Sequence, residues 1–170
     1  MEILQAIKNR RSIRKFNKAK EISKDQIERL LEAARWAPSA GNLQSRFFYV
    51  VYDDKAKADL ALAAFGQDFI TDAAIVFVAC ADLTQNRYGH RGQILYSIQD
   101  ATLGIYNLWL EAQEIGLGGA WVGAFDEIAV SRILEIPKHL RPIAILPIGY
   151  PAESPMPPPR KAIKQISKKI

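Results

Sequence analysis

Apolar residues along this chain follow two alternating patterns. Amphipathic periodicity and local composition predict helices over 2–9, 23–37, 54–65, 94–115 and 126–134. Short, almost wholly apolar runs predict strands over 47–52, 73–81, 118–125 and 142–150. The run AAIVFVACA at 73–81 lacks polar alternation, which is typical of a strand buried on both faces. Because helices and strands alternate, we expect one central sheet in an α/β or α+β domain.

The start of the second predicted helix is marked by local signals. Ser23 is a good N-cap residue, and Gln26 stands three residues later, where it completes a capping box. Ile22 and Ile27 occupy the two positions of a hydrophobic staple. Pro38 ends the helix, because the residue before a proline avoids the helical conformation.

The longest predicted helix carries a continuous apolar seam. Its members alternate four and three residues apart, and Gly116 closes the helix. The seam could pack within the chain or against a second copy, and the pattern favours neither arrangement. The seam consists of Ile94, Ile98, Ala101, Ile105, Leu108, Ala112 and Ile115.

The segment 151–170 differs from the rest of the chain. Its first part, PAESPMPPP, is rich in proline, which excludes a central helix or strand over 151–159. We expect residues 1–150 to form one domain, and 151–170 to be an arm of that domain lying over another surface. Such an arm, together with the apolar seam, suggests a dimer.

Length and composition exclude several classes of protein. A chain of 170 residues with 49% apolar and 24% charged residues is typical of one globular domain with a core. No apolar run approaches the ~20 residues that a membrane helix needs, and the N-terminus MEILQAIKNRR does not resemble a signal peptide. A single cysteine excludes an internal disulfide, so we expect a cytoplasmic location and no membrane partner.

Several reactive or aromatic residues are predicted to be structural. Cys80, within an apolar strand, is interpreted as a small core residue. His90 and His139 lack Cys or carboxylate neighbours at metal-ligand spacing, so no metal site is predicted. Trp36 and Trp109 lie on predicted helices and are interpreted as packing residues.

The net charge indicates an anionic partner. The formal charge is +5 and the pI about 9.3, which suits either a nucleic acid or a nucleotide cofactor. Basic residues gather at 8–20 and 160–169, whereas aromatic residues lie in apolar strands. A nucleic-acid-binding module places basic and aromatic residues on one face, so it is the less favoured alternative.

One segment is suited to bind phosphate. In an extended RRSIRKF segment (10–16), Arg10, Ser12 and Arg14 face the same side. Two guanidinium groups and a hydroxyl match phosphate oxygens well. The alternative is an exposed basic turn, which these residues alone favour.

Two further segments are suited to contact a flat ligand. The loop PSAGNLQ (38–44) combines small residues with the amides of Asn42 and Gln44, although it could be only a turn. The glycines of GLGGAWVGAF (116–125) allow the backbone to approach a ring, and the segment lacks the GxGxxG order of a dinucleotide-binding motif. Arg160 and Lys161 are either a second phosphate contact or part of a soluble tail.

These segments occur in the order typical of the nitroreductase family of FMN-dependent proteins, which the chain resembles over nearly its whole length. The matching elements are RRSIRKF, APSAGNLQ, the seam helix with GLGGAWVGAF, and GYPAESPMPPPRK. The resemblance implies an α+β fold of three-layer α/β type, with a central mixed sheet and helices on both faces. It also implies a homodimer with exchanged C-terminal arms and two FMN sites at the subunit interface.

The resemblance further implies which residues bind the phosphate end of FMN. The N-terminal clamp for the phosphate and ribityl chain would be Arg10, Arg11, Ser12 and Arg14. Arg160, with Lys161, would add a C-terminal phosphate contact.

Other implied contacts surround the flavin ring. Gly66 or Gln67 falls near the amide contact to the pyrimidine edge, and Gln67 is the better chemical fit. The loop that reaches the flavin of the other subunit would comprise Pro38, Ser39, Ala40 and Asn42. The strip beside the isoalloxazine, with a backbone N–H for flavin N5, would comprise Trp121, Val122, Gly123 and Ala124.

The implied activity is that of an NAD(P)H-dependent oxidoreductase. Hydride from NAD(P)H would pass through flavin N5 to a nitroaromatic, quinone or similar acceptor in a ping-pong reaction, without a catalytic side chain. Dehalogenation, flavin fragmentation and desaturation are alternatives within the same family. Two departures bear on the acceptor pocket: Ser45-Arg46 replaces a common Pro-Trp, and Gly123 stands where an acidic residue often stands.

Overall fold

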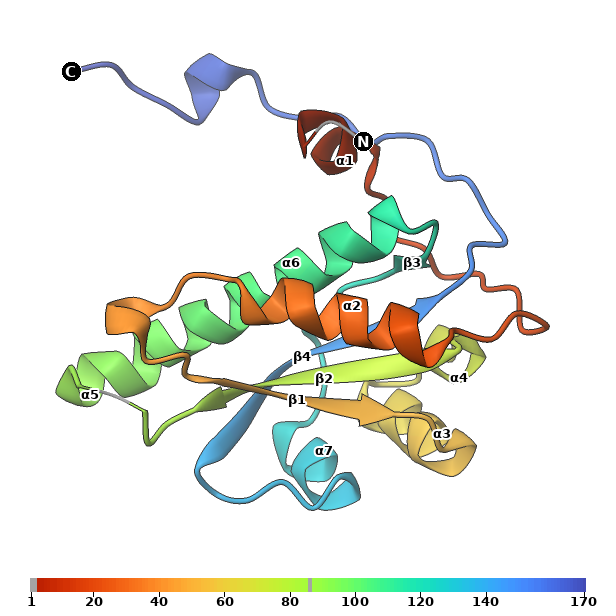
Figure 1. The fold of residues 1–170 in the computed structure, drawn as a ribbon, viewed down its shortest axis with the longest axis horizontal. Coiled ribbons are helices and arrows are strands. Elements are labelled where there is room, and N and C mark those ends of the chain that lie inside the picture. Colours follow the sequence, from red (N-terminus) through yellow and green to blue (C-terminus); the bar gives the residue numbers. More distant parts are fainter. Residues whose placement is uncertain (1–2, 86) are drawn as a thin grey trace.

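A four-stranded sheet forms the centre of the protein. The computed structural model describes residues 3–85 and 87–170, and the strand order within them is β1-β2-β4-β3 (Figure 1). The strands are β1 (Arg46–Val51), β2 (Ile75–Asp82), β3 (Gly118–Gly119) and β4 (Leu140–Gly149). All three strand pairings are antiparallel, and among the described residues the parallel contribution is one bridge between Ser12 and Gly119. The sheet expected to be mixed is therefore antiparallel except at that bridge.

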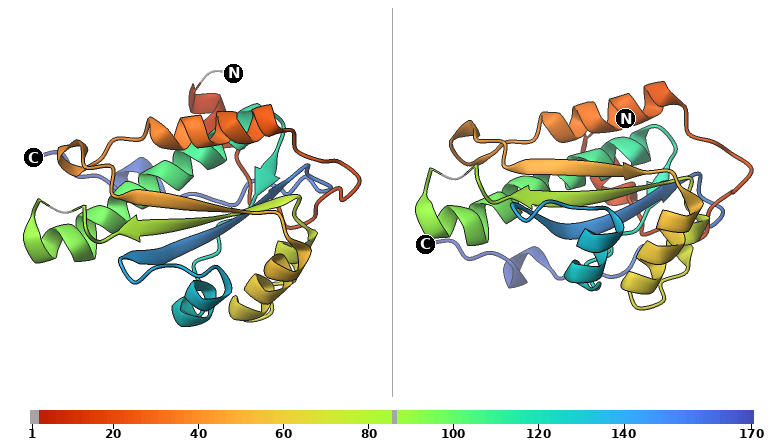
Figure 2. Two further views of the ribbon diagram at one scale, coloured as in Figure 1. Left: turned by 60° about the horizontal axis from the view of Figure 1, so that its bottom comes forward. Right: turned by 90° about the horizontal axis from the view of Figure 1, so that it is seen from below.

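Helices cover both faces of this sheet. On one face lie α2 (Lys24–Arg35) and α6 (Ser97–Glu114), and on the other lie α3 (Asp54–Ala63), α4 (Phe69–Asp72) and α7 (Glu127–Ile133) (Figures 1 and 2). The three-layer α+β class predicted from the sequence is confirmed. Short elements complete the chain: α1 (Ile3–Asn9), α5 (Gly89–Arg91), a π-helical turn η2 (Gly92–Tyr96), and 3-10 turns η1 (Ala40–Asn42) and η3 (Ile163–Gln165).

Strand β2 supplies side chains to the cores on both faces. Val76, Val78 and Cys80 pack among α3 and α7, while Phe77 and Ala79 pack under α2 and α6. Side chains of a strand alternate between faces, so a strand covered on both sides has few polar positions. The prediction for this run is confirmed. Cys80 is a buried core residue as predicted, and burial raises the pKa of its thiol to about 12.

The predicted start of the second helix is also confirmed. Ser23 Oγ accepts a hydrogen bond from the Gln26 backbone N–H at 3.2 Å, and Gln26 Oε1 accepts one from the Ser23 N–H at 3.0 Å. This capping box fixes the first turn of α2, whose Leu30 and Ala34 are then buried against α6 and the sheet.

The predicted strand over 118–125 is wrong for most of its length. Gly119 pairs with Ile148, and Val122 exchanges two hydrogen bonds with Ile145 at 2.9 Å in the same register. The intervening partner on β4 is Pro147, which has no N–H to donate. The ladder is interrupted there, so β3 is limited to Gly118–Gly119 and the strip 120–125 lies beside the sheet as irregular backbone.

The apolar seam belongs mainly to the core of this chain. Its residues Ile105, Leu108 and Ala112 are buried within the α2–α6 core, and Ala101 is also buried. Ile94, in the π-helical turn before α6, is 53% exposed. The two alternatives for the seam are thereby separated: its centre packs within the chain, and its N-terminal end remains exposed.

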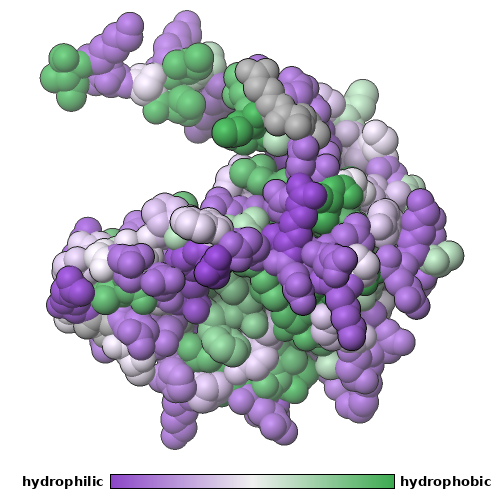
Figure 3. All heavy atoms as spheres, viewed as in Figure 1, coloured by the Kyte–Doolittle hydropathy of each residue, from purple (hydrophilic) through white to green (hydrophobic). Residues whose placement is uncertain are grey.

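The C-terminal segment leaves the body of the protein after β4. It ends away from the sheet, and the space-filling view shows open space between this arm and the body (Figures 1 and 3). All residues from Met156 to Ile170 are exposed, including the apolar Ile163 and Ile166. Among the described residues, no helix is long and apolar enough to cross a lipid bilayer.

Candidate anion and flat-ring site

The basic N-terminal segment lies directly against the glycine-rich strip. Ser12 forms a parallel bridge with Gly119, and the Ile13 N–H donates to the Gly119 carbonyl at 2.9 Å. A Cβ atom on Gly118 would lie 2.6 Å from Ile13 Cγ1, so glycine is required for this close approach. Two segments separated by more than a hundred residues are thus joined at one edge of the sheet.

Arg10 occupies the inner end of this arrangement. Its guanidinium lies over the Trp109 ring with Cζ 4.2 Å from the ring centroid, which is cation–π geometry. Its Nε is buried and has no hydrogen-bond partner among the described residues. A buried donor without an acceptor is energetically costly, so an anion that supplied one would be favoured here. Trp109 is 6% exposed, and the prediction that it packs is confirmed.

Gln67 contacts the same strip, and Arg14 lies near the short helix that follows Gln67. Gln67 Nε2 donates to the Ala124 carbonyl at 3.2 Å and to the Ala64 carbonyl at 3.0 Å. Arg14 is exposed, with its guanidinium carbon 5.7 Å from the centroid of the Phe69 ring. Gln67 therefore contacts the strip formed by Trp121, Val122, Gly123 and Ala124, and the segment that carries Arg10, Ser12 and Arg14 adjoins the start of this strip at Gly119.

Three of the predicted basic contacts are placed elsewhere within a single chain. Arg11 Nη1 donates to the carbonyls of Lys8 at 2.7 Å and Arg10 at 2.8 Å, where it satisfies the end of α1. Arg160 donates to the carbonyls of Pro158 and Pro159 on the arm, and Lys161 is exposed there. One chain thus does not bring Arg160 and Lys161 to Arg10.

The loop 38–44 lies at the opposite end of α6. The backbone N–H of Ala40 donates to Asp100 Oδ1 at 3.0 Å, and that of Ser45 donates to Asp100 Oδ2 at 3.4 Å. Asp100 is in the first turn of α6, whereas Trp109 lies nine residues further along, which corresponds to about 13 Å of helix rise. The predicted loop residues Pro38, Ser39, Ala40 and Asn42 are therefore separated by much of α6 from the segment that contains Arg10 in the same chain.

The loop has an unusual backbone conformation that is stabilised by hydrogen bonds. Gly41, Asn42 and Gln44 have φ values of +57°, +57° and +54°, which lie in the left-handed region. Such conformations are costly for non-glycine residues and persist only where the surroundings enforce them. The Gln44 N–H donates to Ser39 Oγ at 3.0 Å, which closes the loop internally.

Trp36 borders a cavity of about 350 Å³ beside this loop. It is 75% exposed, and its indole N–H donates to Glu32 Oε1 at 2.6 Å. The prediction that Trp36 packs within the chain is wrong, because it stands at the C-cap of α2, where the side chain has left the buried face of the helix.

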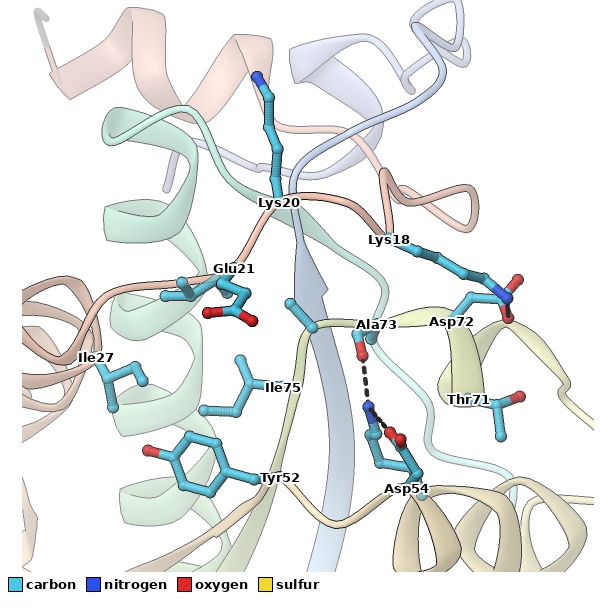
Figure 4. A pocket seen from close by; sticks show the side chains of 13 residues that line it. Lys18, Lys20, Glu21, Ile27, Tyr52, Asp54, Thr71, Asp72, Ala73 and Ile75 are labelled. Carbon is cyan, nitrogen blue, oxygen red and sulfur yellow. Dashed lines mark hydrogen bonds and ion pairs between the residues drawn. The ribbon is translucent and has the colours of Figure 1, made fainter.

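A cavity of about 590 Å³ lies apart from all these segments (Figure 4). Lys57 Nζ, which is buried next to it, donates to the Ala73 carbonyl at 3.0 Å and pairs with Asp54 at 2.8 Å. Lys18 on its wall pairs with Asp72 at 2.6 Å. These cations already have partners, so the electrostatics of the cavity give no preference for an anion.

Comparison with known proteins agrees with this geometry. A sequence profile of the nitroreductase family matches residues 7–67 and 61–150 of the chain. The chain belongs to the nitroreductase family. The family predicted from the sequence is therefore confirmed.

Individual family members resemble the chain over most of its length. An NADH dehydrogenase of Thermus thermophilus is 32% identical over an alignment of 189 positions, gaps included, which covers 92% of this chain and 90% of the relative. An FMN reductase [NAD(P)H] of Bacillus subtilis is 26% identical over 94% of this chain and 70% of the relative. The structure of the NADPH:FMN oxidoreductase of Vibrio harveyi, complexed with NAD+, superposes with a TM-score of 0.90 at 26% identity and covers 98% of this chain and 76% of that one.

The structure explains one departure of this nitroreductase-family chain from the expected loop sequence. Arg46 donates to the carbonyls of Arg35 at 2.9 Å, Ala37 at 2.7 Å and Pro38 at 3.2 Å, which lie between the end of α2 and the loop. Burial lowers the pKa of Arg46, and the nearby Asp100 carboxylate acts in the opposite direction. Ser45 Oγ donates to the Gln85 carbonyl at 2.6 Å. The Ser45-Arg46 pair therefore holds the loop in place.

The second departure leaves space. Gly123 is exposed, and a Cβ atom built there would meet only Trp121, with Nε1 at 3.4 Å. No neighbouring backbone among the described residues blocks a side chain at this position. The strip is thus open above Gly123.

Asp100 is a functional candidate that the sequence analysis missed. It is 2% exposed and accepts hydrogen bonds from Ala40 within the loop 38–44 and from Ser45 directly after it. The signal for it in the sequence was weak: an acidic residue directly precedes Ala101 of the apolar seam, and a carboxylate that is buried at such a position needs hydrogen-bond donors.

We expect the Asp100→Asn variant to destabilise the protein. Loss of the charge from a buried acceptor of two backbone N–H groups should lower the free energy of unfolding by about 1–3 kcal/mol. Urea denaturation measures the change. The matched control is Glu28→Gln, an exposed position on α2. An Asp100→Asn variant as stable as this control would contradict the role assigned to the carboxylate.

Proposed function

We propose that this chain is an FMN-dependent oxidoreductase that takes hydride from NAD(P)H and passes it to a nitroaromatic, quinone or similar small acceptor. The observation that carries the proposal is the buried, unpartnered Arg10 Nε beside the Ser12–Gly119 bridge and the open glycine-rich strip. This combination fits a ligand with a phosphate at one end and a flat ring at the other. The names of the FMN reductase and the NADPH:FMN oxidoreductase among the relatives support the choice of FMN.

The phosphate end would be held by charge-assisted hydrogen bonds. Arg10 has its plane fixed by Trp109, so it can present its donors with little loss of side-chain freedom. Ser12 adds a hydroxyl from the adjoining backbone, and Arg14 adds an exposed cation on the same segment. Arg160 and Lys161 would join them from an arm that lies over a second chain.

The ring end would lie on the strip 121–124. When bound, FMN supplies hydride acceptance and donation at N5. The Val122 N–H already donates to the Ile145 carbonyl, so the donor to N5 would come from Gly123 or Ala124, whose N–H groups have no partner among the described residues. Gln67, held by the Ala124 carbonyl, would offer its amide to the pyrimidine edge.

A homodimer would complete this site. The loop 38–44 is held at the far end of α6 from Arg10, so its contact with a flavin bound near Arg10 requires a loop from a second chain. Exposed apolar side chains on the α2–α6 side of the protein give such a chain a surface to cover, with Ile3 77%, Leu4 54% and Trp36 75% exposed. The exposed isoleucines of the arm would then be buried against the partner.

Truncation tests the dimer. We expect the full chain to be a dimer by light scattering at micromolar concentration, and a chain lacking 151–170 to dissociate more readily and to retain less FMN. Leu62→Ser, at an exposed apolar position on the opposite face of the sheet, should change neither property. A flavin-loaded monomer of the full chain would overturn the shared site.

Substitution of Arg10 tests the phosphate clamp. Arg10→Ala removes a charge-assisted hydrogen bond of about 1.5–3 kcal/mol, which corresponds to a roughly ten- to hundredfold loss of FMN affinity. Fluorescence titration of the apoprotein with FMN measures it, and Arg132→Ala on α7 is the control for charge. Equal affinities of the two variants would contradict the clamp.

Flavin bleaching tests the reaction. NADH or NADPH should bleach the bound flavin in a stopped-flow experiment, and initial rates with a nitroaromatic or quinone acceptor should give parallel lines, because donor and acceptor occupy one slot in turn. Gly123→Leu should slow bleaching at least tenfold and retain FMN, since it fills the open space above the strip; Gly123→Ala should be milder. If dithionite reduces the flavin and neither nicotinamide cofactor does, the proposed function is wrong.

A further inference from the structure

An aromatic side chain that none of the predicted contacts includes, that of Tyr88, packs on the loop 38–44. A Cβ atom on Gly41 would lie 2.5 Å from the hydroxyl oxygen of Tyr88, so the phenol is packed directly on the glycine at the middle of the loop. Gly41 also has a positive φ of 57°. Glycine at this position therefore allows both the left-handed backbone conformation of the turn and the close packing of the Tyr88 ring.

Tyr88 belongs to a small cluster on the segment that precedes α6. Its ring meets that of Tyr96 edge to face, with centroids 5.4 Å apart and planes at 80°. Arg91 Nε donates to the Tyr96 hydroxyl at 3.0 Å, and its guanidinium carbon lies 5.5 Å from the centre of the Tyr96 ring. We call these three residues, Tyr88, Arg91 and Tyr96, the aromatic wall.

The aromatic wall is anchored to the same supports as the loop. Ser45 Oγ donates a hydrogen bond to the Gln85 carbonyl, which precedes Tyr88 in the chain, at 2.6 Å. Ser97 Oγ donates one to the Gln93 carbonyl, which lies between Arg91 and Tyr96 in the chain, at 2.7 Å. Figure 1 places α5 and the loop after α2 at the same end of the molecule. The wall and the loop thus form one surface.

Neither tyrosine of the wall contributes to the protein core. Tyr88 is 43% exposed, and both rings lie outside the two clusters of buried apolar residues. An aromatic ring held in place by neighbours yet left open on one side is suited to stack on a planar ligand.

The charge around the wall is positive. Arg87, His90 and Arg91 lie within five residues that contain no acid. The terminal guanidinium nitrogens of Arg91 have no carboxylate partner in the described part of the chain. The nearby acids are already engaged, because Asp82 accepts from Thr84 and Asp100 accepts from the loop. A planar ligand on Tyr88 would therefore meet an available cation at its edge.

We propose that the aromatic wall of one chain forms a side of the acceptor slot on its partner, and that it selects aromatic acceptors bearing a carboxylate or similar anionic substituent. This inference rests on the proposed function, in which the loop 38–44 reaches the partner's flavin. Tyr88 then lies beside the slot because it packs on that loop. Tyr88 stacks on the acceptor ring, and Arg91, held by Tyr96, pairs with the anionic substituent.

Two acceptors of similar shape and different charge test the proposal. The probes are 4-nitrobenzoate and the uncharged 4-nitrobenzyl alcohol, with KM from turnover and Kd from calorimetry on the oxidised protein as purified. Arg91→Gln should raise Kd and KM for 4-nitrobenzoate about tenfold, in keeping with the loss of one charge-assisted bond, and change those for the alcohol less than about twofold. Tyr88→Ala should weaken both probes, and Tyr88→Phe should retain binding because the ring remains.

The control is Tyr52→Ala, which removes an exposed tyrosine from the distant 590 Å³ cavity and should leave both constants unchanged. Equal losses of affinity for the charged and uncharged probes in Arg91→Gln, or constants for Tyr88→Ala that match those of the control, would contradict the proposed role of the aromatic wall. FMN affinity and flavin bleaching by NAD(P)H are measured in every variant. Failure of the wild type in those two assays refutes the proposed function, whereas the calorimetric Kd still decides whether the wall binds anionic aromatics.

Discussion

The buried carboxylate of Asp100 is the interaction on which the arrangement of the candidate site depends. Located in the first turn of α6, it accepts hydrogen bonds from Ala40 within the loop 38–44 and from Ser45 directly after it, and so fixes that loop at one end of the helix. Trp109, further along the same helix, holds Arg10 near the other end. A single rigid helix therefore keeps the two halves of the site apart within one chain, and this separation is the physical basis for inferring that two chains share each site.

The elements of the fold that could be predicted are those whose signals are local. The Ser23–Gln26 capping box depends on residues three positions apart, and the buried strand β2 is visible from an apolar run alone. The extent of β3 could not be predicted in the same way. It is limited by Pro147, which lies on a neighbouring strand and becomes its partner only after folding. Trp36 was misassigned for a similar reason, since its exposure depends on where α2 ends.

The candidate site likewise contains some features that the sequence could predict and others that depend on tertiary contacts. The family resemblance predicted that the segment 10–14 and the glycine-rich strip contribute to one site. The Ser12–Gly119 bridge is consistent with that prediction. Asp100 was missed, and the role of Arg46 in holding the loop was not predicted, because both act through hydrogen bonds to backbone groups, which no residue pattern specifies. Arg160 and Lys161 mark a further limit: a single chain leaves them on an arm, away from the residues that they were predicted to join.

Pro147 has a consequence beyond the length of one strand. The exposed border of a sheet is a template on which another polypeptide can add by backbone hydrogen bonding, and long, regular borders promote aggregation. In this protein the border formed by β3 is only two residues long, and Gly119 is already occupied by the N-terminal segment. Pro147, in the interior strand β4, thus protects the sheet edge at β3 from pairing with another polypeptide. It also leaves backbone N–H groups of the strip that follows β3 free to bind a small molecule.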